Sequence, residues 1–112
     1  SDGMVQVSVN GTRLTAVEGE STGRDVFVCI RSEDVVLERG QATASSARNH
    51  LAGTVISATV LGALAQVTID CGFPLVAMVT RSTVEEFGLS SGVPVVAAIK
   101  AGSVHLVARQ GE

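Results

Sequence analysis

Three short segments of the chain concentrate side chains that can donate hydrogen bonds. Ser46–His50 combines hydroxyl, guanidinium and amide donors, and Thr80–Thr83 adds three hydroxyls and an arginine just before a predicted helix. The third segment, Ala97–Val104, holds Lys100, the single lysine among eight basic residues, between small residues that allow a ligand or another chain to come close. Donors without clustered carboxylates suit a small anion, because charge-assisted hydrogen bonds are the strong ones. An ordinary surface role for Lys100 stays open.

The same residues argue against catalysis and metal binding. The sequence contains no nucleophile–base motif, no phosphate-binding glycine loop and no metal-ligand spacing. Cys29 and Cys71 lie in or beside apolar runs and are expected to be buried thiols. His50 is expected in a loop and His105 in a strand, neither as a ligand. We therefore predict a binding protein rather than an enzyme, with no catalytic residue, no metal and no cofactor.

Composition excludes several other classes. The 112 residues are 46% hydrophobic and 17% charged, which is typical of a folded protein, and no apolar run reaches the roughly 18 residues of a membrane-spanning helix. A net charge of −3, with three Phe as the only aromatic residues, argues against a nucleic-acid partner, which needs a basic face. No signal-peptide pattern is present, which favours a cytoplasmic setting.

Valine-rich runs separated by Gly, Ser and Asn predict an all-β protein. Asn10-Gly11 favours a two-residue hairpin turn. Ser82 and Glu85 have the spacing of a capping box before a short helix over Thr83–Phe87, which Gly88 would end. The predicted strands are Met4–Val9, Arg13–Val17, Arg24–Arg31, Asp34–Glu38, Gly53–Val60, Ala65–Asp70, Leu75–Val79, Val93–Lys100 and Val104–Ala108.

An internal repeat divides these strands into two sets. Gly23–Leu37 aligns without gaps to Gly92–Leu106, and in this alignment Arg31 corresponds to Lys100. The first copy has no counterpart to Ser46–Gly62, so either another part of the structure supplies that strand or the chain is a fragment of a longer protein; we favour the fragment.

The repeat predicts two OB-like barrels in tandem, the first incomplete and the second with one short helix. We place the partial first barrel at residues 1–40, a linker at 41–45, the second barrel at 46–109 and a tail at 110–112. An incomplete barrel leaves strand edges open, and pairing with a second copy would close them.

The motifs of the second copy resemble the Mop, or molbindin, module of the TOBE family. The resemblance covers about residues 46–107 and keeps the spacing throughout. It rests on S-A-R-N-H-L at 46–51, Gly53, V-x-I-D at 67–70, V-T-x-x-[ST]-V at 79–84, Gly88-Leu89 and A-x-I-K-A-x-S-V at 97–104. The segment I-R-S-E-D-V-x-L at 30–37 resembles part of the C-terminal regulatory region of importer ATPase subunits, with Ser32 in place of the usual proline.

This resemblance implies a cytoplasmic sensor that binds molybdate or tungstate at interfaces between modules. Carried over by position, the binding residues are Ser46 and Arg48, Thr80 and Thr83, and Lys100 with the backbone N–H of Ala101. Gly102 stands where Ser or Thr is often found. The resemblance also implies a homodimer and, in the longer protein, an ATPase domain and a membrane permease that hold the chain at the inner face of the membrane.

Three alternatives remain open at this point. The first is a structural dimerisation module with a degenerate pocket, which Gly102 and the incomplete first copy favour. The second is the ligand-binding tail of a molybdate-responsive transcription regulator, against which the I-R-S-E-D-V segment speaks. The third is a storage protein of paired modules, although this chain has the S-A-R-N motif once. The sequence does not distinguish molybdate from tungstate.

Overall fold

Short strands make up most of the chain described by the computed structural model, which covers residues 3–17, 25–40 and 48–109. The all-β prediction is therefore confirmed. The elements in chain order are β1 (Met4–Val9), β2 (Thr12–Val17), β3 (Val26–Cys29), the 3-10 turn η1 (Ser32–Asp34), β4 (Val36–Glu38), β5 (Arg48–Leu61), β6 (Leu64–Asp70), β7 (Pro74–Thr80), α1 (Arg81–Phe87), β8 (Pro94–Lys100), the 3-10 turn η2 (Ala101–Ser103) and β9 (His105–Ala108).

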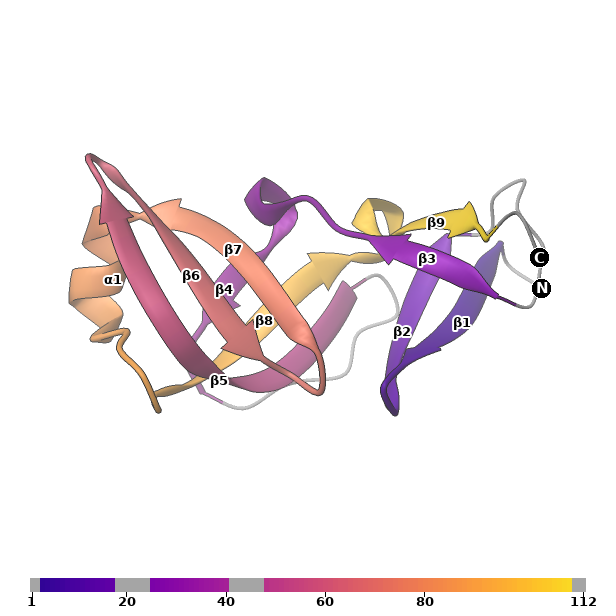
Figure 1. The fold of residues 1–112 in the computed structure, drawn as a ribbon, viewed down its shortest axis with the longest axis horizontal. Helices are drawn as coiled ribbons and strands as arrows, with labels where there is room; N and C mark the ends of the chain where they lie inside the picture. The colour runs from indigo at the N-terminus through magenta and orange to yellow at the C-terminus, as the bar shows by residue number, and fades with distance from the viewer. Residues whose placement is uncertain (1–2, 18–24, 41–47, 110–112) are drawn as a thin grey trace.

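A five-stranded antiparallel sheet of order β4-β8-β5-β6-β7 forms the larger half of the molecule (Figure 1). Its edge strands β4 and β7 contact each other, so the sheet curls towards a closed barrel. Strand β5 is central to this curl because its first part pairs with β8 and its second part with β6, with a bulge between Val55 and Ser57. At the crossing, a Cβ on Gly53 would lie 2.9 Å from the Asp70 carbonyl oxygen, so only glycine fits there.

Two smaller pairs of strands form the other half. Hairpin β1–β2 turns at Asn10-Gly11, whose φ values of 49° and 85° are those of the turn that this dipeptide favours. Strands β3 and β9 form a separate antiparallel ribbon, although they come from opposite ends of the sequence. Figure 1 shows both pairs beside each other at the end of the molecule away from α1.

The two copies of the repeat exchange strands. In the alignment of the two copies, η1 corresponds to η2 and β4 corresponds to β9. The repeat seen in the sequence is therefore also present in the structure. Strand β3 of the first copy pairs with β9 of the second, and β8 of the second pairs with β4 of the first. Even the register is matched: Val36 lies opposite Ala98, and their counterparts His105 and Cys29 lie opposite each other. Each half is therefore built from both copies.

Aliphatic side chains fill the core. The largest fully buried residues are Leu14, Val55, Val67, Ile69 and Ile99. Because Leu14 belongs to the hairpin and the other four to the five-stranded sheet, a single cluster joins the two halves. Burial of these side chains is worth about 1.5–3 kcal/mol each, which makes the cluster the main source of stability.

Asn49 is the one buried polar residue in the described part of the chain, and it joins β5 to the hairpin. Its side-chain oxygen accepts a hydrogen bond from the Thr15 N–H at 2.8 Å, and its Nδ2 donates to the Thr15 carbonyl at 2.9 Å. The same Nδ2 donates to the Ile99 carbonyl at 3.3 Å. The Asn49 side-chain amide thus satisfies the N–H and the C=O of Thr15, as a neighbouring strand would do along this edge of β2. A second contact, from the Thr12 hydroxyl to the Cys71 carbonyl at 2.9 Å, supports the same junction.

Several local predictions were wrong. Strand β5 begins at Arg48 rather than Gly53, so Arg48–His50 is strand and not loop. Arg48 is exposed, Asn49 is buried and His50 is half-buried, an alternation that fits a strand of the sheet. Cys29 is exposed rather than buried, because exposure alternates along β3 and Cys29, like Phe27, lies on its exposed face. The predicted linker at 41–45 lies outside the described residues.

We predict that Asn49→Ala lowers the free energy of unfolding by about 2–4 kcal/mol, because it leaves the partly buried Thr15 N–H and C=O without their partners. Urea unfolding followed by circular dichroism measures the loss. Gln6→Ala is the matched control, since the exposed Gln6 amide donates to the hydroxyl of the same Thr15 and should matter by less than about 0.5 kcal/mol. Equal losses for the two variants would contradict the role given to Asn49.

Candidate functional site

Arg48 and Lys100 lie directly opposite each other where β5 pairs with β8. Both side chains are exposed, and both come from segments that the sequence analysis selected. Like charges at opposed positions of an antiparallel pair destabilise a sheet, by about 0.2–1 kcal/mol. Two cations placed in this way offer an anion a charged hydrogen-bond donor from each of two adjacent strands.

A groove of about 230 Å³ runs beside this pair. Its polar lining consists of Arg48, Lys100 and Ser103 together with the carboxylates of Glu33 and Asp34, and its apolar lining consists of Val36 and Ala98. The two carboxylates belong to η1 of the first copy and reach the groove because β4 pairs with β8. Sequence reasoning missed them, because no local pattern shows that residues 33–36 lie beside residue 100.

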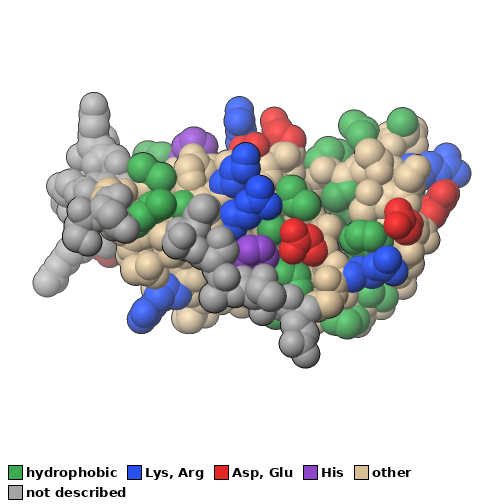
Figure 2. Space-filling view, turned by 180° about the vertical axis from the view of Figure 1, so that it is seen from behind, with side chains coloured by type: hydrophobic (Ala, Val, Ile, Leu, Met, Phe, Trp, Pro, Cys, Tyr) green, Lys and Arg blue, Asp and Glu red, His purple; other side chains and the backbone are tan. Residues whose placement is uncertain are grey.

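The negative charge of Asp34 is already engaged. Arg31 donates from Nε to the Asp34 carboxylate at 3.0 Å, and this hydrogen bond, with the attraction of the same carboxylate, raises the pKa of Arg31. Arg31 is the counterpart of Lys100 in the repeat, but the turn after Lys100 carries Ser103 where the first copy carries Asp34. Glu33 has no ion pair within 4 Å among the described residues. The groove therefore contains charges of both signs, and Figure 2 shows basic and acidic side chains together near the middle of one face.

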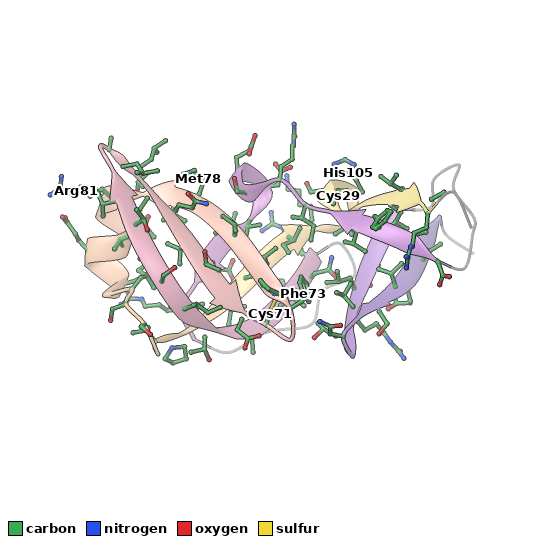
Figure 3. The ribbon with its side chains drawn as sticks, in the orientation of Figure 1. Cys29, Cys71, Phe73, Met78, Arg81 and His105 are labelled. Atoms are coloured by element: carbon green, nitrogen blue, oxygen red, sulfur yellow. The ribbon has the colours of Figure 1, made fainter. Side chains whose placement is uncertain are left out.

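Thr80 and Thr83 lie elsewhere, at the junction of β7 and α1. Their hydroxyl oxygens are 2.9 Å apart, and the Thr83 N–H donates to Thr80 Oγ1 at 3.1 Å. Neither lines the groove, and α1 lies at the far end of the sheet from η2, as the position of Arg81 in Figure 3 shows. One chain thus brings Arg48 and Lys100 together, and separately Thr80 and Thr83, without joining the two pairs.

The helix begins differently from the prediction. Its N-cap is Thr80, not Ser82, and Glu85 accepts from Arg81 Nε at 3.2 Å instead of reaching back to Ser82. The chain leaves β7 at Thr80 in an extended conformation, so the cap falls two residues earlier than the capping-box spacing indicated. Gly88 ends the helix in the left-handed conformation, as predicted.

Two further predicted donors, Ser46 and the Ala101 N–H, and the position of Gly102 complete the comparison with the sequence. Ser46 lies outside the described residues. Ala101 begins η2 directly after Lys100 and is buried, so its backbone lies beside the Arg48–Lys100 pair. Gly102 is exposed, and a Cβ built on it meets nothing within 4 Å, which leaves room for the hydroxyl side chain that this position lacks.

His50 and the cysteines add little to the site. His50 lies in β5 rather than in a loop; its side chain is 11% exposed, with Nε2 3.9 Å from Glu38. Cys29 lies opposite His105 on the outer face of the β3–β9 ribbon (Figure 3). Cys71 is buried, and desolvation raises the pKa of its thiol. Within the described ranges, no three His, Cys, Asp or Glu side chains are grouped so as to hold a metal ion.

The described residues also include no helix long and apolar enough to cross a membrane.

Comparisons with known proteins found a matching family, a similar sequence and a similar fold. The family model described as "TOBE domain" matches residues 45–106. The chain is 32% identical over 102 residues to the molybdate/tungstate import ATP-binding protein WtpC of Pyrococcus abyssi, an alignment that covers 88% of this chain and 28% of that protein. It is also similar to a solved structure of the cytoplasmic molybdate-binding protein ModG with molybdate bound, with 31% identity and a TM-score of 0.76 over 88% of this chain and 78% of that one. The predicted fold class is confirmed by this likeness.

We predict that Thr80→Ala lowers the free energy of unfolding by about 1 kcal/mol, because it removes the acceptor of the Thr83 N–H at the start of α1. Ser82→Ala, two residues further on, should change it by less than about 0.5 kcal/mol. Thermal or urea unfolding of both variants distinguishes the two caps, and a larger loss for Ser82→Ala would restore the capping box that the sequence indicated.

Proposed function

Because the chain belongs to the TOBE domain family, we propose that it is a regulatory domain that binds molybdate or tungstate. The observation that carries the proposal is the opposed pair of Arg48 and Lys100 at the edge of a groove. A dianion that donates no hydrogen bonds at neutral pH requires a site made of donors and positive charge. Both relatives named above are described as handling molybdate, which supports this choice of anion.

The complete site is proposed to form between two copies of the chain. The Arg48–Lys100 pair and the Thr80–Thr83 pair lie at different ends of one five-stranded sheet, so one copy offers each ligand only half of the predicted donors. In a two-fold dimer, the cationic half of each copy meets the hydroxyl half of its partner, which gives two equivalent sites. Ser46 and the Ala101 N–H are assigned to the cationic half.

Binding at such an interface couples ligand to assembly. A ligand that binds only the assembled pair stabilises it by mass action, and the shift grows with ligand concentration. High cytoplasmic oxyanion would thereby hold the regulatory region in one arrangement and restrain transport, which requires that the two arrangements differ in affinity for the ligand.

The proposed parent protein is an importer ATPase subunit. The chain spans 28% of the length of the ATP-binding protein that it matches. We propose that the ATPase domain lies in the part outside that match. We propose that this chain has no catalytic role of its own, binds no cofactor and works at the cytoplasmic face of the membrane beside a permease. Within it, we propose a partial first barrel at 1–40, a linker at 41–45 and a Mop-like barrel at 46–109.

A second candidate is a structural dimerisation module whose pocket no longer binds. The carboxylates of Glu33 and Asp34 in the groove favour it, because they offer the two cations internal counter-charges. Gly102 favours it as well, since it removes a hydroxyl donor. The alternatives differ in a single measurable property, the affinity for oxyanions.

We predict that isothermal titration calorimetry detects binding of molybdate and tungstate. These anions are larger than sulfate because their bonds to oxygen are longer. Lys100→Ala should weaken the affinity by about 10- to 100-fold, the value of a charge-assisted hydrogen bond. Arg13→Ala is the matched control, because Arg13 is an exposed strand cation opposite Ser8 on the hairpin.

Absence of heat with every oxyanion would exclude the sensor and leave the structural module. Equal heats with sulfate would exclude selectivity. Unchanged affinity in Lys100→Ala, with binding intact in the Arg13→Ala control, would show that the site lies elsewhere.

We further predict that two deficient variants complement each other. Thr83→Val removes the Thr83 hydroxyl from the hydroxyl half, while Thr80 Oγ1 and the backbone N–H of residue 83 keep the cap. Lys100→Ala removes one of the two cations from the cationic half. Mixed in equal amounts, the two chains form mixed dimers in which one site is intact, so about a quarter of all sites should regain wild-type affinity. Calorimetry of the mixture against each variant alone measures this recovery; no recovery would mean that the donors do not come from different copies.

A further inference from the structure

The repeat extends upstream of the ungapped segment Gly23–Leu37 and shows which strand has no counterpart. Strands β3 and β8, β4 and β9, and turns η1 and η2 correspond in the alignment that places Arg31 on Lys100. The hairpin β1–β2 corresponds to β6–β7, because the alternating inward positions of β1 match those of β6, with Val5 on Val67, and Leu14 and Ala16 match Leu75 and Ala77. Among the described residues, only β5 and α1 of the second half have no equivalent.

The place of the missing strand follows from the neighbours of β5. In the second half, β5 lies between β8 and β6, with Leu51 opposite Ala97 and Asn49 opposite Ile99. A Cβ on Gly53 would come within 3.3 Å of the Cys71 Cβ. The first-half counterparts of Ala97, Ile99 and Cys71 are Val28, Ile30 and Val9.

An apolar groove lies at that place. It has a volume of about 250 Å³ and is lined by Val9, Val28 and Ile30 and by the first residues of β7, from Phe73 to Val76. All three counterparts derived from the repeat therefore face one hollow between β1 and β3. Each of these strands has a single partner in the described structure, β2 for β1 and β9 for β3, so both have an open edge.

The β7 side of the groove also matches the surroundings of β5. Asn49 binds the backbone N–H and C=O of Thr15 on the outer edge of β2. The counterpart of Thr15 is Val76, which lies in the groove on β7, the edge strand of its sheet. Thr15 lies opposite Gln6, and Val76 lies opposite the corresponding Thr68, so the two outer edges correspond in register. An asparagine in the missing strand can therefore bind Val76 as Asn49 binds Thr15.

We infer that the hollow between β1 and β3 is an open strand position that binds one extended polypeptide segment of the β5 type. The segment adds to β3 and β1 through main-chain hydrogen bonds, which is the mode of β-strand addition. The segment is recognised by three of its residues. An asparagine binds the backbone of Val76, an apolar side chain two residues later packs against Val28, and a glycine two residues after that leaves room for the Val9 side chain. These are the roles of Asn49, Leu51 and Gly53 in the second half.

A synthetic peptide with the sequence of residues 48–55 and blocked ends tests this inference on the chain itself. With isotope-labelled chain, nuclear magnetic resonance should show saturable shifts of amides in β1, β3 and β7, including Val9, Val28 and Val76. Exchange of the edge amides of β1 and β3 with solvent should slow at the same peptide concentrations, with half-saturation below about 1 mM.

Two altered peptides provide the controls. Replacing the leucine by aspartate places a charge in the apolar groove, and replacing the asparagine by alanine removes the bonds to Val76; each should weaken binding at least about tenfold. Absence of shifts at millimolar peptide would overturn the inference, as would shifts confined to β6 and β8, which would mean that the peptide displaces β5 instead. A dimer detected by ultracentrifugation whose edge amides are protected and which the peptide cannot displace would assign the position to a second copy and overturn it also. None of these outcomes depends on oxyanion binding.

Discussion

Reciprocal exchange of strands between the two copies of the repeat is the constraint on which the rest of this structure depends. Among the described residues, β3 has β9 of the other copy as its one partner, and β8 pairs with β4 of the other copy on the edge that β5 leaves open, so each half contains a strand from both copies. Backbone hydrogen bonds must be satisfied when they are buried, and here the partner strands are distant in sequence. The exchange therefore makes the two halves fold together and fixes the turns η1 and η2 at the junction between them.

The composition of the groove is a direct result of this exchange. Because β4 pairs with β8, η1 brings Glu33 and Asp34 beside Lys100, which belongs to the other copy. A site of donors alone would hold a dianion tightly, whereas carboxylates nearby reduce the attraction. Arg31 moderates this effect by pairing with Asp34. In the proposed sensor, an affinity limited in this way would allow release of the ligand as its concentration falls.

Asn49 shows how one polar residue of a predicted donor-rich segment can serve the fold. It lies in the donor-rich segment next to Arg48, but its amide is buried and its hydrogen bonds go to Thr15 and Ile99. The alternation of a strand explains the difference, since neighbouring residues point to opposite faces. Arg48 therefore faces solvent and is free to meet an anion, while Asn49 holds the hairpin against β5. In the proposed site, the S-A-R-N motif combines a binding residue with a structural one.

The sequence by itself determined the strands, the Asn10-Gly11 turn, the glycine end of α1 and the alignment of the two repeat copies, because these follow from local periodicity and turn chemistry. It also selected Arg48 and Lys100, since residue type and the rarity of lysine are visible without coordinates. The start of β5 and the exposure of Cys29 depended on how neighbouring strands pack, and the cap at Thr80 instead of Ser82 depended on where β7 ends. Only the tertiary structure decided that Lys100 faces Arg48 and Glu33 and that the Thr80–Thr83 pair lies apart, because pairing between distant strands leaves no local pattern in a sequence.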